Sequence, residues 1–337
     1  MKDDWLELEL EKGIEDAISR TRFAPHSNNL LISSWDSSLR LYDVDASLLR
    51  LQAPSQAPLL DCCFQNDVVA FAVATDGLVR RYNLHSGLVD TVGGHDDMAT
   101  CIEYSSETCQ LLTSGFDKKL LLWDTHMEKA SSCLRSLDAV VDSMSVSGFN
   151  LVVSIGASVH VYDLRNFDKP VQSKEAFNGT HIRCVRSVPN AKGNKSDAHA
   201  GFAVGSVDGR VSLQISYPLS SEDIEYTFRC FPKSKDRHYL VSANDIAFSP
   251  LVSGVFVTGD NEGYVIMWDA GSKRRLVELP RFSNSIASLS YNHAGKLLAV
   301  ASSYTYQEAN EIENSPRIFI YKTDNIDTGS ISARRQT

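Results

Sequence analysis

Leu120-Leu121-Leu122-Trp123-Asp124 is a short apolar run that ends in an aromatic residue and an acid. The same pattern recurs at Leu39-Arg40-Leu41-Tyr42-Asp43, Val159-His160-Val161-Tyr162-Asp163 and Val265-Ile266-Met267-Trp268-Asp269. Weaker copies end at Tyr82-Asn83 and Tyr321-Lys322, and matching Gly209-Arg210-Val211 with Gly77-Leu78-Val79 places a further copy at Gln214. The chain is therefore built from copies of one structural unit.

The spacing of these copies predicts the fold. The aromatic position falls at residues 42, 82, 123, 162, 214, 268 and 321, so successive intervals, by subtraction, are 40, 41, 39, 52, 54 and 53 residues. Periods of about 40 to 45 residues are typical of WD-type propeller blades, and each blade has four strands. We therefore predict an all-β, seven-bladed β-propeller with loop insertions in the three longest intervals.

Local patterns within each repeat agree with four short strands. The first strand alternates apolar residues, as in Thr21 and Phe23 or Ile246 and Phe248, which places both members of a pair on one face. A tight turn precedes the strand that ends on the aromatic residue. The turn positions hold residues suited to hairpins, namely Asp36, Asp76-Gly77, Asp117, Gly156, Asp208-Gly209 and Glu262-Gly263.

The two ends of the chain are predicted to meet. Trp5 to Leu10 alternates like a strand, and we expect it to supply the outer strand of the last blade and so to remove an exposed edge. We expect a single propeller domain over residues 1–323. The tail over residues 324–337 lacks periodicity and is predicted to be disordered, and the polar insertion Asn190 to Gly201 is predicted to be a mobile loop.

Composition excludes several functional classes. No apolar run reaches the roughly 18 residues of a membrane span, and Met1 to Trp5 is too polar for a secretory signal, so we expect a soluble intracellular protein. A formal charge of -9 argues against nonspecific nucleic-acid binding. The seven cysteines include no C-x-x-C pair, and no catalytic motif is present. We expect no enzyme activity, cofactor or metal.

The third repeat carries polar residues that suggest a structural role. His95, Ser114, Asp117 and Trp123 resemble the residues of the buried hydrogen-bond network that WD repeats contain. A satisfied network of this kind rigidifies a blade. We therefore interpret these four side chains as structural.

The fifth repeat contains an arginine in its first strand. The alignment places Arg186 where the other repeats have Thr21, Cys62, Ile102, Met144, Ile246 and Leu289. An inward guanidinium group needs a carboxylate, phosphate or carbonyl partner, and that partner is either an internal acid or a ligand.

Other arginines of this repeat are predicted to lie on the same face. Arg183 begins the first strand, Arg210 follows the Asp208-Gly209 turn, and Arg229 follows the same blade. Several guanidinium groups on one face suit a phosphorylated side chain or a pair of glutamates. Trp35 and Phe116 each precede a turn aspartate on this face, and large exposed aromatic residues are common anchors for peptides.

Several segments together resemble the mitotic checkpoint Bub-type WD-repeat propeller. The resemblance covers roughly residues 5 to 322 and is carried by Ser33 to Val44, Val161 to Asn166, Ile182 to Arg186, Asp208 to Val211, Ser285 to Leu289 and Ala301 to Tyr304.

The resemblance implies a kinetochore adaptor without enzymatic activity. Members bind a GLEBS motif, a short and partly helical segment of Bub1-type or BubR-type checkpoint kinases, and they read phosphorylated Met-Glu-Leu-Thr (MELT) repeats of a kinetochore scaffold. By position, Trp35 and Phe116 are implied to contact the kinase segment. Acidic groups of the partners are implied to pair with Arg183, Arg210 and Arg229, with Arg186 as support beneath them. The implied location is the nucleus and, in mitosis, the kinetochore at the centromere of the chromosome, with the cytoplasm and the spindle as alternatives. Apart from its partners, the protein is expected to be monomeric.

The chain departs from that family at three places. Phe116 stands where members usually have tryptophan, Phe231-Pro232 stands where they have a basic pair, and the Asn190 to Gly201 loop is longer. These departures suggest a divergent paralogue. The alternatives are a propeller of nuclear-pore mRNA export and a substrate receptor of a cullin ubiquitin ligase, since Val161 to Arg165 resembles a W-D-x-R docking box.

Overall fold

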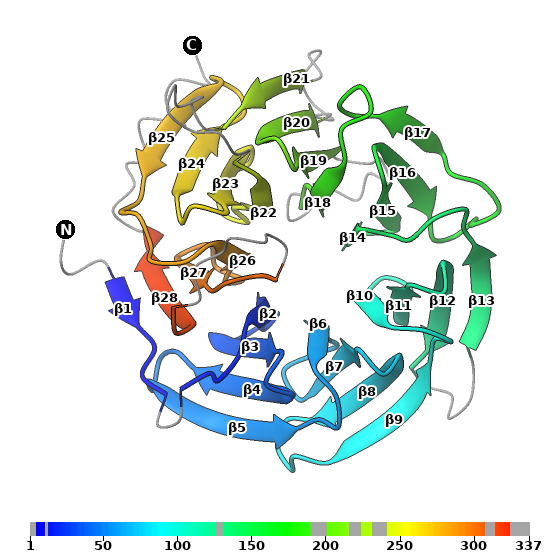
Figure 1. Cartoon of the computed structure of the whole chain (residues 1–337), viewed down its shortest axis with the longest axis vertical. Coiled ribbons are helices and arrows are strands. Elements are labelled where there is room, and N and C mark those ends of the chain that lie inside the picture. Colours follow the sequence, from blue (N-terminus) through cyan, green and yellow to red (C-terminus); the bar gives the residue numbers. More distant parts are fainter. Residues whose placement is uncertain are drawn as a thin grey trace.

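The computed structural model is a disc of β-sheets arranged around a central axis (Figure 1). It describes residues 5–10, 13–125, 131–189, 201–215, 224–230, 241–306 and 314–323, with residues 131–134 described by their backbone only. Within these ranges, 28 strands form seven sheets of four antiparallel strands each. The predicted all-β, seven-bladed propeller is confirmed.

We number the blades along the chain, and each blade is given from its inner to its outer strand. Blade 1 is β2 (Ile18–Phe23), β3 (Asn29–Ser34), β4 (Ser38–Asp43) and β5 (Leu48–Pro54); blade 2 is β6 (Leu59–Phe64), β7 (Val69–Ala74), β8 (Leu78–Asn83) and β9 (Val89–Gly94). Blade 3 is β10 (Ala99–Ser105), β11 (Gln110–Gly115), β12 (Lys119–Asp124) and β13 (Ser131–Ser136); blade 4 is β14 (Ser143–Ser147), β15 (Asn150–Ile155), β16 (Ser158–Asp163) and β17 (Gln172–Glu175).

The remaining blades follow the same order. Blade 5 is β18 (Ile182–Ser187), β19 (Gly201–Ser206), β20 (Arg210–Ile215) and β21 (Ile224–Arg229). Blade 6 is β22 (Ala243–Phe248), β23 (Val255–Asp260), β24 (Val265–Asp269) and β25 (Arg274–Glu278). Blade 7 is β26 (Ile286–Tyr291), β27 (Leu297–Ser302), β28 (Arg317–Lys322) and β1 (Trp5–Glu7).

The repeat positions read from the sequence all fall at one place in the blade. Residues 42, 82, 123, 162, 214, 268 and 321 are each the next-to-last residue of a blade's third strand, from Tyr42 on β4 to Tyr321 on β28. The repeat positions therefore located the third strand of every blade correctly, including blade 5, where Gln214 replaces the aromatic residue.

The N-terminal strand closes the ring as predicted. β1 pairs antiparallel with β28, with Trp5 opposite Tyr321 and Glu7 opposite Phe319. The Trp5 ring packs against Tyr321 at 4.5 Å between centroids and against Phe282 at 5.4 Å. Strand and aromatic contacts together hold the two ends of the chain in one blade.

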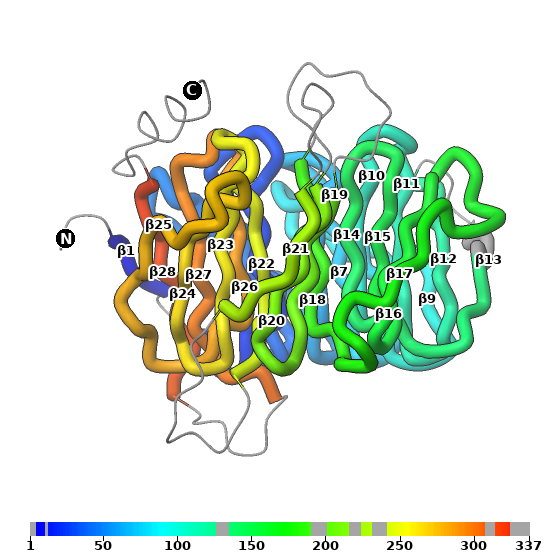
Figure 2. Tube along the Cα trace, turned by 90° about the horizontal axis from the view of Figure 1, so that it is seen from above, coloured from blue at the N-terminus to red at the C-terminus, as the bar shows by residue number. Residues whose placement is uncertain are grey.

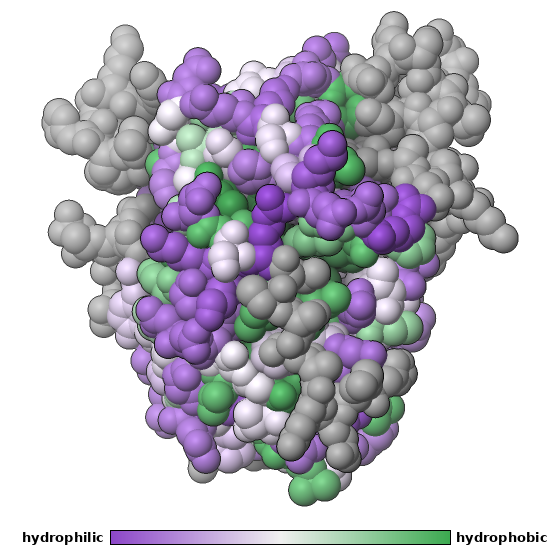
Figure 3. Space-filling model, turned by 90° about the vertical axis from the view of Figure 1, so that its right-hand side faces the viewer, coloured by the Kyte–Doolittle hydropathy of each residue, from purple (hydrophilic) through white to green (hydrophobic). Residues whose placement is uncertain are grey.

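The hydrophobic core lies between adjacent blades. One cluster joins Leu31 and Leu41 of blade 1 to Cys62 and Ala72 of blade 2, and the other pairs of neighbours are joined in the same way. The flank of the disc in Figure 3 is mostly hydrophilic, with its hydrophobic residues in small separate groups. No helix in the described ranges has the length and apolarity needed to cross a bilayer.

Figure 2 shows the disc from its side, with connections on two opposite faces. We call one of them the top face: it carries the turn between the second and third strands of each blade, such as residues 35–37, 116–118 and 207–209, and also the start of each inner strand. The tail at 324–337, Phe231-Pro232 and residues 190–200 of the insertion lie outside the described residues, so the predictions made for them stay predictions.

Candidate functional site

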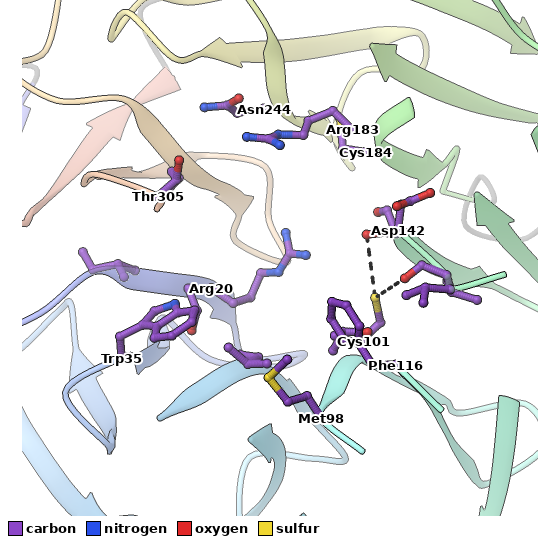
Figure 4. Close-up of a pocket in the computed structure, with 18 of the residues that line it drawn as sticks. Arg20, Trp35, Met98, Cys101, Phe116, Asp142, Arg183, Cys184, Asn244 and Thr305 are labelled. Atoms are coloured by element: carbon purple, nitrogen blue, oxygen red, sulfur yellow. Dashed lines mark hydrogen bonds between the residues drawn. The ribbon is translucent and has the colours of Figure 1, made fainter. Parts of the chain in front are cut away.

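A cavity of about 420 Å³ opens at the centre of the top face. Its wall contains a residue at or directly before the start of each inner strand, and Figure 4 labels Asp142, Arg183 and Asn244 among them. These residues form a ring, which we call the bulge ring: Ser19, Leu60, Thr100, Asp142, Arg183, Asn244 and Ala287.

Local backbone geometry explains why these side chains face the cavity. Six of the inner strands shift register after their first pair, for example between Ile182 and Cys184 on β18, which leaves Arg183 as the extra residue. A β-bulge re-aims a side chain in this way. β14 has no such shift in the described structure, and Asp142, directly before it, takes the corresponding place.

Aromatic and sulfur side chains line one side of the cavity. Trp35 lies on the β3–β4 turn, Phe116 on the β11–β12 turn, and Met98 on the connection into blade 3. Phe116 is 46% exposed, which is high for a large apolar side chain. Trp35 packs edge-on against Tyr306 at 5.3 Å, and the Tyr306 hydroxyl donates to Asp16 Oδ1 at 2.7 Å. Contacts from blade 7 therefore orient the aromatic ring of Trp35.

Arg20 and Arg186 also line the cavity, and buried carboxylates hold both. Arg186 Nη2 lies 2.6 Å from Asp245 Oδ1, while Arg20 Nε lies 3.0 Å from Asp61 Oδ1 and its Nη1 lies 3.4 Å from Asp245 Oδ2. Burial alone would lower the pKa of both arginines. At Arg20 the attraction of Asp61 and Asp245 outweighs burial, and the pKa is raised. At Arg186 burial outweighs the attraction of Asp245, and the pKa is lowered. Arg186 therefore lines the cavity and is held there by an internal ion pair with Asp245.

The predicted alignment of Arg186 was wrong by one residue. Counted from the bulge, Val185 corresponds to Thr21 of β2, and Arg186 corresponds to Arg22. A shift of one residue moves a side chain to the other face of a strand. Arg186 consequently belongs to the face that carries Arg20 and Asp245, where an ion pair is possible.

Arg183 has an acidic neighbour within the bulge ring. Asp142 Oδ1 lies 3.7 Å from Nε2 of His181, and Asp142 Oδ2 accepts a 2.7 Å hydrogen bond from the Gly156 amide. Burial raises the pKa of Asp142, although Gly156, His181 and Arg183 oppose the rise. Opposite charges on Asp142 and Arg183 thus lie beside the His181 ring at the rim between blades 4 and 5.

Arg210 and Arg229 lie together, but outside the cavity lining. They are paired across β20 and β21, and both contact Asp208, at 2.8 Å from Arg210 Nε and at 3.6 Å from Arg229 Nη2. Arg210 Nη2 also donates to Thr180 Oγ1 at 2.7 Å. Burial tends to raise the pKa of Asp208, but hydrogen bonds from Arg210 and Ser206 outweigh it and lower the pKa. This pair adds positive charge to the top face of blade 5.

The structure therefore gathers Trp35, Phe116, Arg183 and Arg186 around one cavity and leaves Arg210 and Arg229 on the rim of the same face. Sequence reasoning missed other lining residues. Arg20 was detectable, because a charged residue in an inner strand invites the same argument as Arg186. The positions of Met98 and Asp142 in the wall, and of Tyr306 beside Trp35, depend on loop paths that carry no pattern in the sequence.

Comparisons with known proteins agree with this architecture. Residues 10–43 and 86–124 match the family described as WD domain, G-beta repeat. The chain is 52% identical to mitotic checkpoint protein BUB3.3 of Arabidopsis thaliana over 316 residues, which cover 94% of this chain and 98% of that protein. It is 37% identical to mitotic checkpoint protein BUB3.1 of the same plant (95% and 93% covered) and 33% identical to mitotic checkpoint protein bub3 of Dictyostelium discoideum (93% of each). The chain belongs to the mitotic checkpoint BUB3 family.

As a BUB3 homologue, the chain is a WD-repeat adaptor and not an enzyme. One of its two WD matches, residues 86–124, contains a hydrogen-bond chain that runs through blade 3. Trp123 Nε1 donates to Thr113 Oγ1 at 2.8 Å, Thr113 Oγ1 lies 2.8 Å from His95 Nε2, and His95 Nδ1 lies 2.9 Å from Asp117 Oδ1. The hydroxyl in this chain belongs to Thr113 and not to Ser114, which corrects the sequence interpretation. Adjacent residues of a strand point to opposite faces, so only one of the two hydroxyls reaches His95.

Two expectations from the sequence concern parts of this BUB3 family member other than the cavity: the docking box around Arg165 and a metal site. Arg165, the residue behind the ubiquitin-ligase alternative, pairs with Asp163 at 2.8 Å and lies over the Phe149 ring at 4.8 Å. Within the described residues, no group of three or more His, Cys, Asp or Glu side chains is placed to hold a metal ion.

Proposed function

We propose that this chain is a spindle-checkpoint adaptor whose top face binds acidic segments of partner proteins. The partners are a GLEBS-type segment of a Bub1-type or BubR-type checkpoint kinase and phosphorylated MELT repeats of a kinetochore scaffold. Joint binding would place the kinase at kinetochores in the nucleus during mitosis. The observation that supports this function most directly is the cavity in which Trp35 and Phe116 face Arg183.

The chemistry of the cavity suits an acidic peptide. Exposed aromatic rings supply apolar contact area at small entropic cost, and Phe116 is nearly half exposed. Across the cavity, Arg183 presents a guanidinium group that suits carboxylate or phosphate oxygens, and Arg210 and Arg229 extend the positive charge outward. Hydrogen bonds to charged groups contribute about 1.5 to 3 kcal/mol each.

Calorimetric titration tests the proposal directly. The ligands are a GLEBS segment of a checkpoint kinase and a MELT peptide in phosphorylated and unmodified forms. We expect the kinase segment to bind, and we expect phosphorylation to increase the affinity of the MELT peptide. Equal affinity for the two MELT forms would contradict phosphopeptide reading, and failure of the kinase segment to bind would contradict the adaptor function.

Substitutions assign each ligand to its part of the site. Arg183→Glu should weaken phosphorylated MELT binding at least a hundredfold, because it replaces an attraction by a repulsion beside the phosphate. Phe116→Ala should weaken binding of the kinase segment by about 2 kcal/mol, the usual cost of truncating an aromatic anchor. The matched control is Arg274→Glu, an exposed charge reversal on the outer strand β25, which should change neither affinity.

Co-purification from dividing cells separates the alternatives. Recovery of a checkpoint kinase supports the proposal, whereas recovery of a nuclear pore protein in its place supports mRNA export. Recovery of a cullin ligase adaptor that is lost in an Arg165→Glu variant supports the substrate-receptor function.

A further inference from the structure

The bulge ring is uncharged except for two residues, which carry charges of opposite sign. Of its members, Ser19, Leu60, Thr100, Asn244 and Ala287 carry no charge, whereas Asp142 and Arg183 are charged and come from consecutive blades. Asp142 is also the one carboxylate among the lining residues that the structure describes. A negative group therefore lies in the wall of a site whose chemistry otherwise favours anions.

Asp142 is held in place rather than extended into solvent. Its Oδ2 accepts the Gly156 amide at 2.7 Å, and its side chain is 23% exposed. Its Oδ1 lies 3.7 Å from His181 Nε2, a distance at which a protonated imidazole attracts the carboxylate. Arg183 lines the same cavity from the start of the next inner strand, and its charge opposes the rise that burial causes in the pKa of Asp142.

The other lining arginines have a different arrangement. Arg20 and Arg186 are paired with Asp61 and Asp245, which lie beneath the cavity and do not line it. A ligand can approach those arginines without meeting their carboxylates. A ligand that approaches Arg183 meets Asp142 on the same wall.

We propose that Asp142 is a specificity-determining residue that acts as an internal competitor for acidic ligands at Arg183. Its carboxylate occupies the cationic side of the cavity when no partner is bound, and it repels an acidic group that enters. The result is a lower affinity for acidic segments in general, so that tight binding also requires the aromatic contacts of Trp35 and Phe116. This inference rests on the proposed function, because it assumes that acidic segments bind at this face.

The test is the affinity of phosphorylated MELT peptide for Asp142→Asn, measured by calorimetry at low and high salt. The asparagine keeps an oxygen for the Gly156 amide and removes the charge. We expect about tenfold tighter binding, equivalent to about 1.4 kcal/mol. The gain should shrink in about 1 M salt, where the screening length falls to about 3 Å. A misfolded variant would lose affinity, so a gain reports the charge itself.

Asp138→Asn is the matched control. Asp138 is exposed, lies four residues earlier on the same connection and is not among the lining residues, so its removal changes the net charge equally. Equal gains in the two variants would overturn the inference, because they would show a long-range effect of net charge.

The remaining outcomes separate the inference from the proposed function. If wild type binds, Arg183→Glu does not and Asp142→Asn binds like wild type, the function stands and the role of Asp142 is wrong. If only Asp142→Asn binds, the competitor role is supported in its strongest form. If neither wild type nor Asp142→Asn binds the phosphorylated MELT peptide under any condition, both proposals are overturned.

Discussion

At the scale of single residues, Thr113 joins side chains from separate parts of blade 3. Its hydroxyl receives the Trp123 indole N–H and, with His95 protonated on Nδ1 toward Asp117, donates to His95 Nε2. Every donor in this chain of hydrogen bonds then has an acceptor, from the Trp123 indole to the Asp117 carboxylate.

Thr113→Val should therefore lower the free energy of unfolding by about 1 to 3 kcal/mol, because two buried nitrogens lose their partner while the shape is kept. Urea denaturation measures the change. Ser114→Ala removes the neighbouring hydroxyl, which lies outside this chain of hydrogen bonds, and should cost less. A Ser114 variant that is destabilised as much as the Thr113 variant would refute the assignment.

Arg186 shows where sequence reasoning about the site ends. The sequence predicted a buried arginine that needs an acid, but it could not identify Asp245, which is 59 residues away on the next inner strand. The bulge does not explain the alignment error, because β2 and β18 shift register at the same place and so stay in step with each other. By contrast, the faces of Trp35 and Phe116 were predictable, because the turn aspartates beside them repeat along the chain.

At the scale of elements, the β23–β24 turn holds a carboxyl group with an unusual environment. Asp260 is fully buried and accepts the amides of Glu262 at 3.0 Å and Tyr264 at 2.7 Å. Gly263 has φ +89, and a Cβ there would meet the Phe282 carbonyl at 2.5 Å, so the turn needs glycine. Burial raises the pKa of Asp260 to about 7, despite those amides, and the charge of Glu262 adds to the rise.

This raised pKa predicts a pH-dependent stability. Between the ordinary pKa near 3.8 and about 7, the folded state binds more protons at Asp260 than the unfolded state, so this group lowers stability as pH rises through that window. Asp260→Asn removes the titration. Its stability relative to wild type should therefore increase between pH 5 and pH 8, on the order of 2 kcal/mol, as measured by urea denaturation.

The control for this pH effect is Asp138→Asn, which alters an exposed carboxylate and should show no such trend. A constant difference between Asp260→Asn and wild type across this pH range would mean that Asp260 is already charged at pH 5. The turn residues themselves were predictable from Glu262-Gly263, whereas the burial of Asp260 follows from packing that the sequence does not display.

At the scale of the whole molecule, polar side chains link neighbouring inner strands. Oxygens of Asp61, Ser143, Asp245 and Ser288 accept backbone amides of the next blade at 2.9 to 3.1 Å, including the step from blade 7 to blade 1, where Ser288 receives Thr21. These contacts satisfy buried amides at the inner ends of the sheets. They make each blade depend on its neighbours, so an opening at one place weakens the ring as a whole.

The blade 7 closure is where that dependence can be tested. Removal of residues 1–10 deletes β1 and leaves the edge of β28 unpaired, and it uncovers apolar surface now covered by Trp5 and the buried Leu8. Burial of one such side chain contributes about 1.5 to 3 kcal/mol, so we expect a loss of at least about 3 kcal/mol in unfolding free energy and a tendency to aggregate. Urea denaturation and light scattering measure these effects. Removal of residues 324–337, predicted to be disordered, should leave both unchanged, and an unchanged urea midpoint after loss of β1 would show that the ring is held closed without it.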